Sequence, residues 1–548
     1  MTLAWAAALL LLPAVVAGAS TGTVSSIVVE RKNVFDPSVP GEDLWPFRAA
    51  NSIHVRTRPE VVGRELLLGP GSPWDPLAAA ETERNLRAMG FLRRADTAFG
   101  AQALRVTTQD AWSLIPRVGV GGEGGEYTLT AGLDERNLLG YGKRVGFLHS
   151  EETGGERRTE AVYSDPRLAG SRLQLAARAA DTSRGDELGA QVVRPFYSLT
   201  TRGSLGLSAA RIVQDESLYE GSEESSRFTQ DFRAVRLRAG ALAGRRAGAV
   251  HRLFAGMHYE RSRFGRLSST VGELPSDRTL SGPVAGYSLL QARYFEETDV
   301  DAMRRVEDFN LGNELAVLAG PMLESWGSDR DRWLFSAQDQ QGVSLGPGRF
   351  LLAQVGATAR LARDRFENGI CFASANLFVK GKRPVEQTLV AHLEVDVSER
   401  LDRERQILLG GDSGLRGYRN RSFAGSRSVL ANIEDRFFLE PDFFHLFHLG
   451  WAVFLDAGTV APEGAGFRKA QFRSDIGLGL RVSPSRSASG GVFRVDVAYA
   501  LNDGPGSSRW VVSLKGGQAF SLAGSARRSA LRRPDTGLTG EDRVFRPR

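Results

Sequence analysis

Short segments in which apolar and polar residues alternate follow one another from about residue 126 to residue 520. Within each segment, aliphatic or aromatic residues occupy one parity, and charged residues, glycine or serine occupy the other. A period of two is the spacing of a β-strand with one apolar face. The clearest examples are residues 172–180, 389–398, 475–483, 492–501 and 510–520.

Between 16 and 19 such segments can be counted, and no second apolar layer of helices is present to cover so large a sheet. Closing the sheet on itself removes its edges. With the apolar face outward in lipid and the polar face toward a lumen, the pattern predicts an all-β transmembrane barrel of the outer-membrane type. A soluble β protein with several sheets, polar face outward, is the alternative.

The first residues predict export. Leu3–Val16 is an almost unbroken apolar run, and Ala17-Gly18-Ala19 resembles a small-residue cleavage site, so residues 1–19 are interpreted as a signal peptide. No Lys or Arg precedes the run, and a buried first helix is the alternative. No run of 18 apolar residues follows, so a membrane-embedded mature chain would have to cross with strands.

Residues 20–110 differ from the rest and predict a small α+β domain in the order β-α-α-β-β. A strand is expected at Ser26–Glu30 and a helix at Pro59–Leu67. Asp75 before Pro76 predicts the capped start of a second helix. Two short strands are expected at residues 91–97 and 103–108, before the barrel at residues 111–520.

Charge and cysteine content exclude some classes of function. The chain has 70 Lys and Arg against 64 Asp and Glu, and the two signs are interleaved before the last 30 residues. Nothing therefore predicts a nucleic-acid partner. Cys371 is the single cysteine, so no internal disulfide or cysteine-based zinc site can form. Residues 521–548 are rich in arginine and predict a basic, disordered tail.

Three strings resemble enzyme motifs, and each is given another interpretation. Gly119–Gly124 has spaced glycines but is followed by a strand rather than a helix, so it is read as a junction into the barrel. Gly411–Gly414 contains a serine without any recognisable triad context. His445 and His448 lie among phenylalanines and fit a turn at a membrane interface. We therefore expect no enzyme activity, no metal and no cofactor.

One constellation of charges is more informative. Arg416-Gly417-Tyr418 lies in a Gly- and Arg-rich loop at residues 402–426, followed by two alternating segments. Parity places Glu434 and Asp456 on lumenal faces of those segments. Arg416, on a loop that folds inward, could pair with one or both acids, because an arginine removed from water needs such partners. Ordinary charges of a wet lumen and an exposed loop are the alternative.

These motifs resemble the BamA/TamA superfamily of outer-membrane assembly and translocation proteins, the bacterial surface-antigen type. Arg416-Gly417-Tyr418 resembles the core of the family's sixth-loop motif. The next strand of the family resembles Asn432, Glu434 and Arg436, and its Phe-x-Asp-x-Gly strand resembles Phe454, Asp456 and Gly458. The domain at residues 20–110 resembles a periplasmic POTRA domain. Phe520 resembles the terminal aromatic residue of a barrel-insertion signal.

The resemblance implies a barrel of about 16 antiparallel strands, with the loop held in the lumen by arginine–acid pairing and a side wall that can open. It implies insertion or translocation of client proteins at the bacterial outer membrane, with the POTRA domain in the periplasm. The partners would be the lipid bilayer, unfolded outer-membrane or secreted clients, and periplasmic chaperones or accessory proteins. A two-partner secretion pore for one dedicated protein, and a passive channel or surface antigen, are the alternatives.

Overall fold

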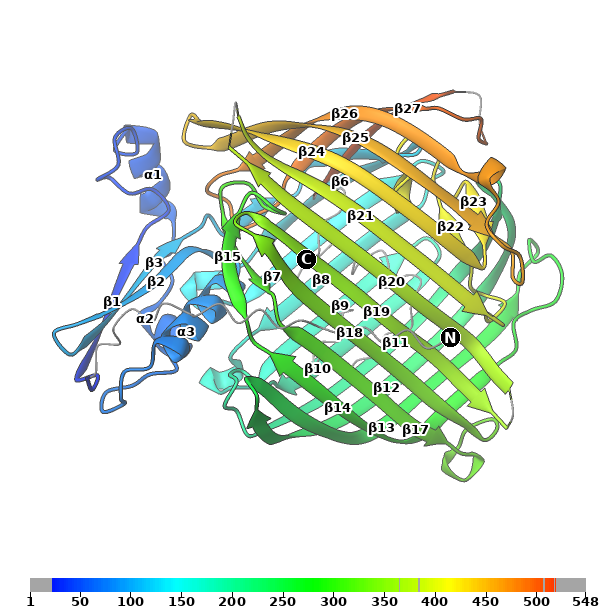
Figure 1. The fold of residues 1–548 in the computed structure, drawn as a ribbon, viewed down its shortest axis with the longest axis horizontal. Coiled ribbons are helices and arrows are strands. Elements are labelled where there is room, and N and C mark those ends of the chain that lie inside the picture. Colours follow the sequence, from blue (N-terminus) through cyan, green and yellow to red (C-terminus); the bar gives the residue numbers. More distant parts are fainter. Residues whose placement is uncertain (1–21, 364, 383–384, 506–507, 517, 519–548) are drawn as a thin grey trace.

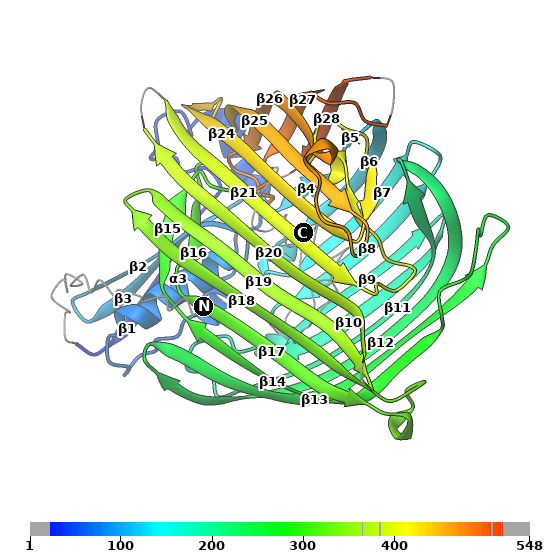
Figure 2. The ribbon, with the colours of Figure 1, turned by 45° about the vertical axis from the view of Figure 1, so that its right-hand side comes forward.

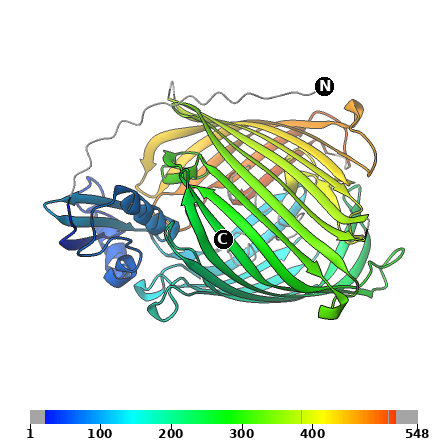
Figure 3. The same cartoon turned by 60° about the horizontal axis from the view of Figure 1, so that its bottom comes forward.

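The structure of the protein is a computed structural model that describes residues 22–363, 365–382, 385–505, 508–516 and 518. The predicted signal peptide (residues 1–19), Phe520 and the basic tail (residues 521–548) lie outside the described residues. The described chain consists of a small N-terminal α+β domain and a closed β-barrel, with the domain at one end of the barrel (Figures 1 and 3). We call this end the domain end.

The N-terminal domain has one three-stranded sheet in the order β1-β3-β2, in which β1 runs parallel to β3 and β2 antiparallel to it. Three helices lie between its first two strands, so the expected order with two helices is wrong; the short first helix, which has no buried residue, was not expected. The elements are β1 (Ser26–Lys32), α1 (Trp45–Ile53), α2 (Pro59–Gly63), α3 (Pro76–Ala88), β2 (Leu92–Gly100) and β3 (Ala103–Asp110).

Helix α3 begins where its cap predicts. The Asp75 side chain accepts hydrogen bonds from the backbone N–H groups of Leu77 (2.9 Å) and Ala78 (3.3 Å), which satisfies two amides that the helix cannot. Leu86 is fully buried on the side facing the sheet, whereas Leu77 is 75% exposed. The domain core continues into the barrel through Ile115 and Ala488, so the two parts are packed together.

The barrel is closed and antiparallel, and it has 20 strands among the described residues, so the expected number of about 16 is wrong. The short strands β4 (Leu114–Pro116) and β5 (Gly119–Glu123) pair one after the other with β6 and count as one interrupted strand. The strands in excess of 16 pair edge to edge within the barrel wall. Five of the six residues of the glycine-rich segment, Gly119–Glu123, therefore form part of the first barrel strand rather than a free junction.

The remaining barrel strands follow in chain order and are drawn in Figures 1 and 2: β6 (Glu126–Glu135), β7 (Arg144–Glu152), β8 (Arg157–Asp165), β9 (Gln174–Thr182), β10 (Gly185–Arg194), β11 (Gly203–Glu220), β12 (Glu223–Arg246), β13 (Ala249–Arg266), β14 (Arg278–Gln291), β17 (Asn313–Met322), β18 (Arg332–Gly346), β19 (Arg349–Ala362), β20 (Arg365–Gly381), β21 (Glu386–Glu399), β24 (Arg427–Phe443), β25 (Phe447–Ala461), β26 (Arg473–Pro484), β27 (Phe493–Ala500) and β28 (Trp510–Gly516).

Two connections between barrel strands carry hairpins of their own. Residues 400–426 join β21 to β24, contain the motif loop (residues 402–426) and pair β22 (Ile407–Leu409) with β23 (Phe423–Gly425). Residues 292–312, which we call the mouth hairpin, join β14 to β17 and pair β15 (Tyr294–Thr298) with β16 (Val306–Asn310). Figure 2 shows the mouth hairpin at the domain end and the motif loop toward the other end.

The two faces of the barrel wall differ as the alternation predicts. Exposed leucine, isoleucine, valine and aromatic side chains recur on the outer face, for example Leu207, Leu237, Ile433 and Leu478. Buried charged and amide side chains recur on the lumenal face. None of the helices in the described part of the chain is long and apolar enough to cross a membrane.

Candidate functional site

The motif loop folds back into the lumen and packs against the wall. Leu409, Leu415 and Tyr418 of the loop form a buried cluster with Leu430 of β24 and Ala500 of β27. The Tyr418 hydroxyl donates to the backbone oxygens of Ser474 (3.0 Å) and Asn502 (3.2 Å). These contacts hold the Arg-Gly-Tyr segment inside the barrel instead of leaving it in solvent.

Arg416 contacts both acids that parity placed in the lumen. Its Nε lies 2.8 Å from Oδ2 of Asp456 and its Nη2 lies 2.8 Å from Oδ1, so the guanidinium grips the carboxylate at two points. Its Nη1 donates to Oε2 of Glu434. The Arg416 guanidinium carbon also lies 3.4 Å from the centroid of the Phe454 ring. Such a charge-assisted, bidentate pair is stronger and more directional than a neutral hydrogen bond.

The pairing of Arg416 is part of a larger group, which we call the lumenal charge cluster. It comprises four arginines and four acids, each at most 1% exposed: Arg416, Arg436, Arg481, Arg494, Glu434, Asp456, Asp475 and Asp496. Glu434, Asp456 and Asp496 form ion pairs with arginines of the cluster, which compensates the burial of those charges.

The cluster is continuous through shared partners. Arg436 Nε lies 2.9 Å from Glu434 Oε1, and Arg481 Nη2 lies 3.5 Å from Glu434 Oε2. Asp496 in turn accepts hydrogen bonds from Arg481 and from Arg494, the latter at 2.7 Å. Among the described residues, Glu434 therefore has three arginine neighbours, whereas Asp456 has Arg416 alone.

The other residues of the motif shape the space around Arg416. Asn432 donates to Oδ1 of Asp456 and to the backbone oxygen of Gly414, both at 2.8 Å, and so ties the loop to the acid. A Cβ added at Gly458 would come within 3.3 Å of Leu409. Glycine at that position lets the loop pack directly on β25.

Gly417 is required by a close approach. A Cβ at this residue would lie 2.5 Å from the Cβ of Asp475 and 3.2 Å from the backbone nitrogen of Ala500. Similarly, a Cβ at Gly477 would lie 2.3 Å from the Phe454 ring. The glycines of β26 thus make room in the lumen for the ring that supports Arg416.

Sequence reasoning did not assign Arg481, Arg494, Asp475 or Asp496 to the site. Parity does place all four on polar faces of residues 475–483 and 492–501. Parity cannot supply the register, which sets Arg481 opposite Arg494 and Asp475 opposite Asp456. The missing signal was therefore the pairing between strands.

The mouth hairpin is a second lumenal element, and the sequence analysis did not anticipate it. Its Val300 and Phe309 pack against lumenal side chains of β19, β20 and β21, with Phe350 and Phe378 stacked at 4.8 Å between ring centroids. The hydroxyl of Thr388 donates to the backbone oxygen of Asp299 at 2.7 Å. The hairpin thus covers part of the barrel interior at the domain end.

The mouth hairpin links the N-terminal domain to the lumenal charge cluster. On one side, Arg87 of α3 contacts Glu296 at 2.6 Å and makes two contacts to Asp308, at 2.6 and 2.9 Å. On the other side, Arg436 of the cluster donates to the backbone oxygen of Val300. A continuous series of polar contacts therefore runs from α3 through the hairpin to Glu434 and Arg416.

The ladder that closes the barrel is short. Among the described residues, β28 and β5 are registered through one pair, Leu514 opposite Gly122, whereas β27 and β28 pair continuously from Phe493–Gly516 to Tyr499–Trp510. We call this closing ladder the seam.

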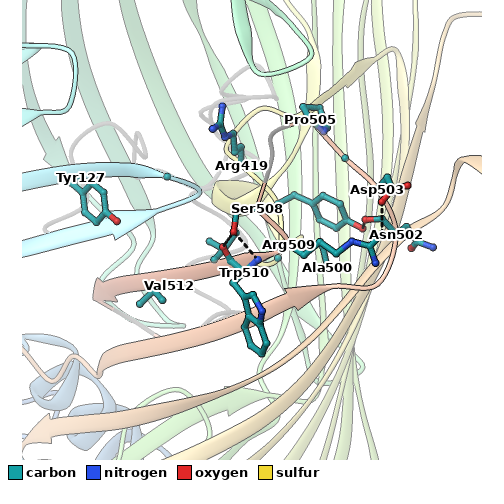
Figure 4. A pocket seen from close by; sticks show the side chains of 15 residues that line it. Tyr127, Arg419, Ala500, Asn502, Asp503, Pro505, Ser508, Arg509, Trp510 and Val512 are labelled. Carbon is teal, nitrogen blue, oxygen red and sulfur yellow. Dashed lines mark hydrogen bonds and ion pairs between the residues drawn. The ribbon is translucent and has the colours of Figure 1, made fainter.

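A cavity of about 340 Å³ lies beside the seam, at the end where β28 begins (Figure 4). Tyr127 of β6 lines one side and Trp510 and Val512 of β28 line the other, with Tyr418 and Arg419 of the motif loop between them. Arg421 of the same loop reaches the first strands through ion pairing with Glu126. The motif loop therefore contacts the strands on both sides of the seam.

Comparison with known proteins yields likenesses in fold. No protein-family model matches the sequence, and no curated protein matches it significantly. Among solved structures, the chain is similar to CdiB from Acinetobacter baumannii (10% identity, 91% of this chain and 74% of that one, TM-score 0.47). It is similar to CdiB from Escherichia coli (11%, 93% and 92%, 0.39). It is also similar to BamA from Haemophilus ducreyi lacking POTRA domains 1–3 (12%, 90% and 84%, 0.36).

Proposed function

We propose that the protein is an outer-membrane barrel that inserts or translocates client polypeptides by opening at the seam. The observation that carries this proposal is a closing ladder that registers one residue pair among the described residues, together with a motif loop that lies against the strands on both of its sides. A barrel that serves only as a passive channel has no need of a weak closing ladder, because full pairing removes the exposed edge.

Membrane embedding is supported by the two faces of the wall. The outer face carries exposed aliphatic and aromatic side chains, and the lumenal face carries the charges. A closed sheet also satisfies its backbone groups without water, as the bilayer requires. The N-terminal domain then lies in the periplasm as a POTRA-like unit, where clients and accessory proteins can reach the open edges of its sheet.

Opening of the seam would expose the edges of β5 and β28. Each exposed edge presents unpaired backbone N–H and C=O groups, to which a client strand can add by β-augmentation. Backbone groups left unpaired in lipid cost several kcal/mol each, so opening is easiest at a ladder with one registered pair among the described residues, where an incoming client strand can satisfy the edges again. Strands paired along their whole length, such as β24 and β25, do not separate so easily.

A reversible crosslink tests this proposal. In a Cys371→Ser background, cysteines at Gly122 and Leu514, which lie opposite each other, would join the seam. A matched control joins Ile433 and Leu455, which lie opposite each other on β24 and β25. Cells depleted of the native protein are complemented with each variant, and their outer-membrane and secreted proteins are inventoried with and without a reductant.

The seam crosslink is expected to abolish complementation until it is reduced, and the control crosslink to leave complementation intact. Loss of many outer-membrane barrels indicates an insertase, and loss of one secreted polypeptide indicates a dedicated secretion pore. Full activity of the oxidised seam variant would overturn opening at the seam. Ion conductance without any change in the protein inventory would make the barrel a passive channel.

A further inference from the structure

A groove on the rim of the barrel at the domain end has no role in the function proposed above. It lies where β9, β10 and β11 meet their turns, and its volume is about 970 Å³. That is at the upper end of the range of small-molecule sites. Its lining combines three arginines, several hydroxyl side chains and two leucines: Arg172, Arg194, Arg202, Ser198, Thr201, Leu173 and Leu205.

Two of the three cations of the groove, Arg194 and Arg202, lack acidic partners among the described residues. Within the described part of the chain, the side chains of Arg194 and Arg202 make neither an ion pair nor a hydrogen bond. Arg172 stacks on the Tyr197 ring at 4.1 Å, and its Nη1 is buried without a hydrogen-bond partner, 3.8 Å from Glu65. A concave site with three guanidinium groups and little opposing charge favours an anionic ligand.

The groove also borders the apolar outer face. Arg194 lies opposite Leu205 in the ladder between β10 and β11, and the next outward pair in that ladder is Val192 with Leu207. Leu205 is 53% exposed and Leu207 is 50% exposed. An arginine at the edge of an apolar band sits at the depth of lipid head groups, where a cation on the outer wall costs little.

Hydroxyl groups and the N-terminal domain complete the site. Ser198 and Thr201 are buried, with their hydroxyl oxygens 2.9 Å apart. The segment that carries them is held by α3, because Glu81 accepts from the backbone N–H of Leu199 (2.8 Å) and Asn85 donates to the backbone oxygen of Tyr197 (3.2 Å). The floor of the groove is therefore set by the docking of the domain.

We propose that this groove binds an anionic phospholipid of the adjacent membrane leaflet. Arg194 and Arg202 contact the phosphate group, and Arg172 and the hydroxyls of Ser198 and Thr201 lie beside it. Leu173 and Leu205 contact the start of the acyl chains. The ligand needs both an anionic head group and an apolar chain, because the cations lie directly against the apolar wall. The bound lipid would lie against the segment that α3 holds and so support the docked position of the domain.

The test compares two pairs of substitutions in the full-length protein. Arg194→Gln with Arg202→Gln removes two unpaired cations of the groove. Arg211→Gln with Arg233→Gln removes two exposed arginines from β11 and β12 that are paired with Asp186 (2.8 Å) and Asp231 (2.9 Å). Arg194→Lys with Arg202→Lys keeps the charge. Slower migration of the boiled than of the unheated protein on a gel checks that each variant has folded.

Lipid retention is measured by native mass spectrometry in detergent micelles doped with dioleoyl phosphatidylglycerol or dioleoyl phosphatidylcholine. The wild type should retain phosphatidylglycerol preferentially. The groove Gln pair should lower that retention on the order of tenfold or more, since each arginine near a lipid surface contributes about 1 kcal/mol. The paired-arginine control should match the wild type, and the lysine pair should remain within about threefold of it.

Three results would overturn the proposal. Equal retention of the two lipids would make the groove a nonspecific apolar surface. Equal loss in the groove pair and the control pair would assign binding to net charge alone. Displacement of the lipid by millimolar inorganic phosphate would assign the site to a free anion. None of these readouts depends on client insertion, so the lipid site and the proposed function can fail separately.

Discussion

Arg416 and Asp456 face each other as a fork and a carboxylate, with two nitrogens of the guanidinium each 2.8 Å from a different oxygen. Neither group is more than 1% exposed. One residue belongs to the motif loop and the other to β25. Their contact is therefore one of the points at which the loop is fixed to the wall, and it depends on geometry as well as on charge.

Replacement of Arg416 by alanine should release the motif loop without unfolding the barrel. Removing one partner of a buried ion pair costs about 3–5 kcal/mol, because the other charge stays buried. Limited proteolysis should show faster cleavage within residues 402–426, while the gel migration of the barrel still changes on heating. Arg419→Ala is the matched control, since Arg419 is exposed. Equal cleavage in the two variants would contradict the role of the pair.

Arg421 is not a suitable control, although it lies in the same loop. Its guanidinium pairs with Glu126 of β6 and stacks on the Tyr219 ring at 4.5 Å. Arg421→Ala should loosen the contact between the loop and the first strands, so we expect an intermediate rate of cleavage.

Gly417→Ala should also displace the loop, although it removes no charge. The new Cβ would lie 2.5 Å from the Cβ of Asp475, and overpacking of this kind costs about 1–3 kcal/mol. Gly466→Ala, where a Cβ would meet nothing within 4 Å, should behave like the wild type. Cleavage within residues 402–426 again reports the difference, and a resistant Gly417→Ala protein would show that the approach is not tight.

Arg87→Ala should weaken the attachment of the mouth hairpin to the N-terminal domain. The Arg87 side chain is 10% exposed and contacts Glu296 and Asp308. Hydrogen bonds to charged groups contribute about 1.5–3 kcal/mol. Hydrogen–deuterium exchange within residues 292–312 should rise. Arg105→Ala removes an exposed arginine of the same domain, 3.8 Å from Glu30, and should leave exchange in the hairpin unchanged.

The mouth hairpin should also loosen as the pH rises. Burial, together with the nearby Asp301 carboxylate, raises the pKa of Glu307 to about 8. A carboxyl group whose pKa is raised in the folded state stabilises that state fully below its ordinary pKa, and the stabilisation is lost as the pH rises toward 8. Exchange within residues 292–312, corrected for its intrinsic pH dependence, should therefore increase between pH 6.5 and 8.5.

Glu307→Gln removes the titrating group and keeps the shape of the side chain. Its hairpin should show the same corrected exchange at both pH values. If the pH dependence persists in this variant, another group is responsible, and Asp299 of the same hairpin, whose pKa is raised by burial, is the first to examine.

The alternation of the sequence was sufficient to predict the closed antiparallel barrel and the lumenal placement of the acids. Glu434 and Asp456 lie on the lumenal face because their strands keep a strict period of two, which a buried face enforces. Asp75 began its helix where expected because capping is a local interaction. The features predicted correctly are those that depend on residues close together in the chain.

The features that were missed depend on residues far apart in the chain. The number of barrel strands depends on which strand edges pair. The sequence of a long strand such as β12 does not indicate whether that strand joins the barrel wall. In the sequence the mouth hairpin resembles a further alternating segment, because Phe295 and Phe309 are well separated from Phe350 along the chain and meet it only in the folded lumen. Register likewise decides that Asp475 faces Asp456.

The width of the ring has a consequence for permeability. The diameter of a barrel grows roughly linearly with the number of strands, so a ring of 20 strands has a cross-section larger by about half than a ring of about 16. The motif loop bears on β24 to β27, and the mouth hairpin bears on β19 to β21. Both the motif loop and the mouth hairpin therefore restrict the passage of small solutes through the lumen. Loss of the mouth hairpin alone should admit antibiotics that the motif loop by itself cannot exclude.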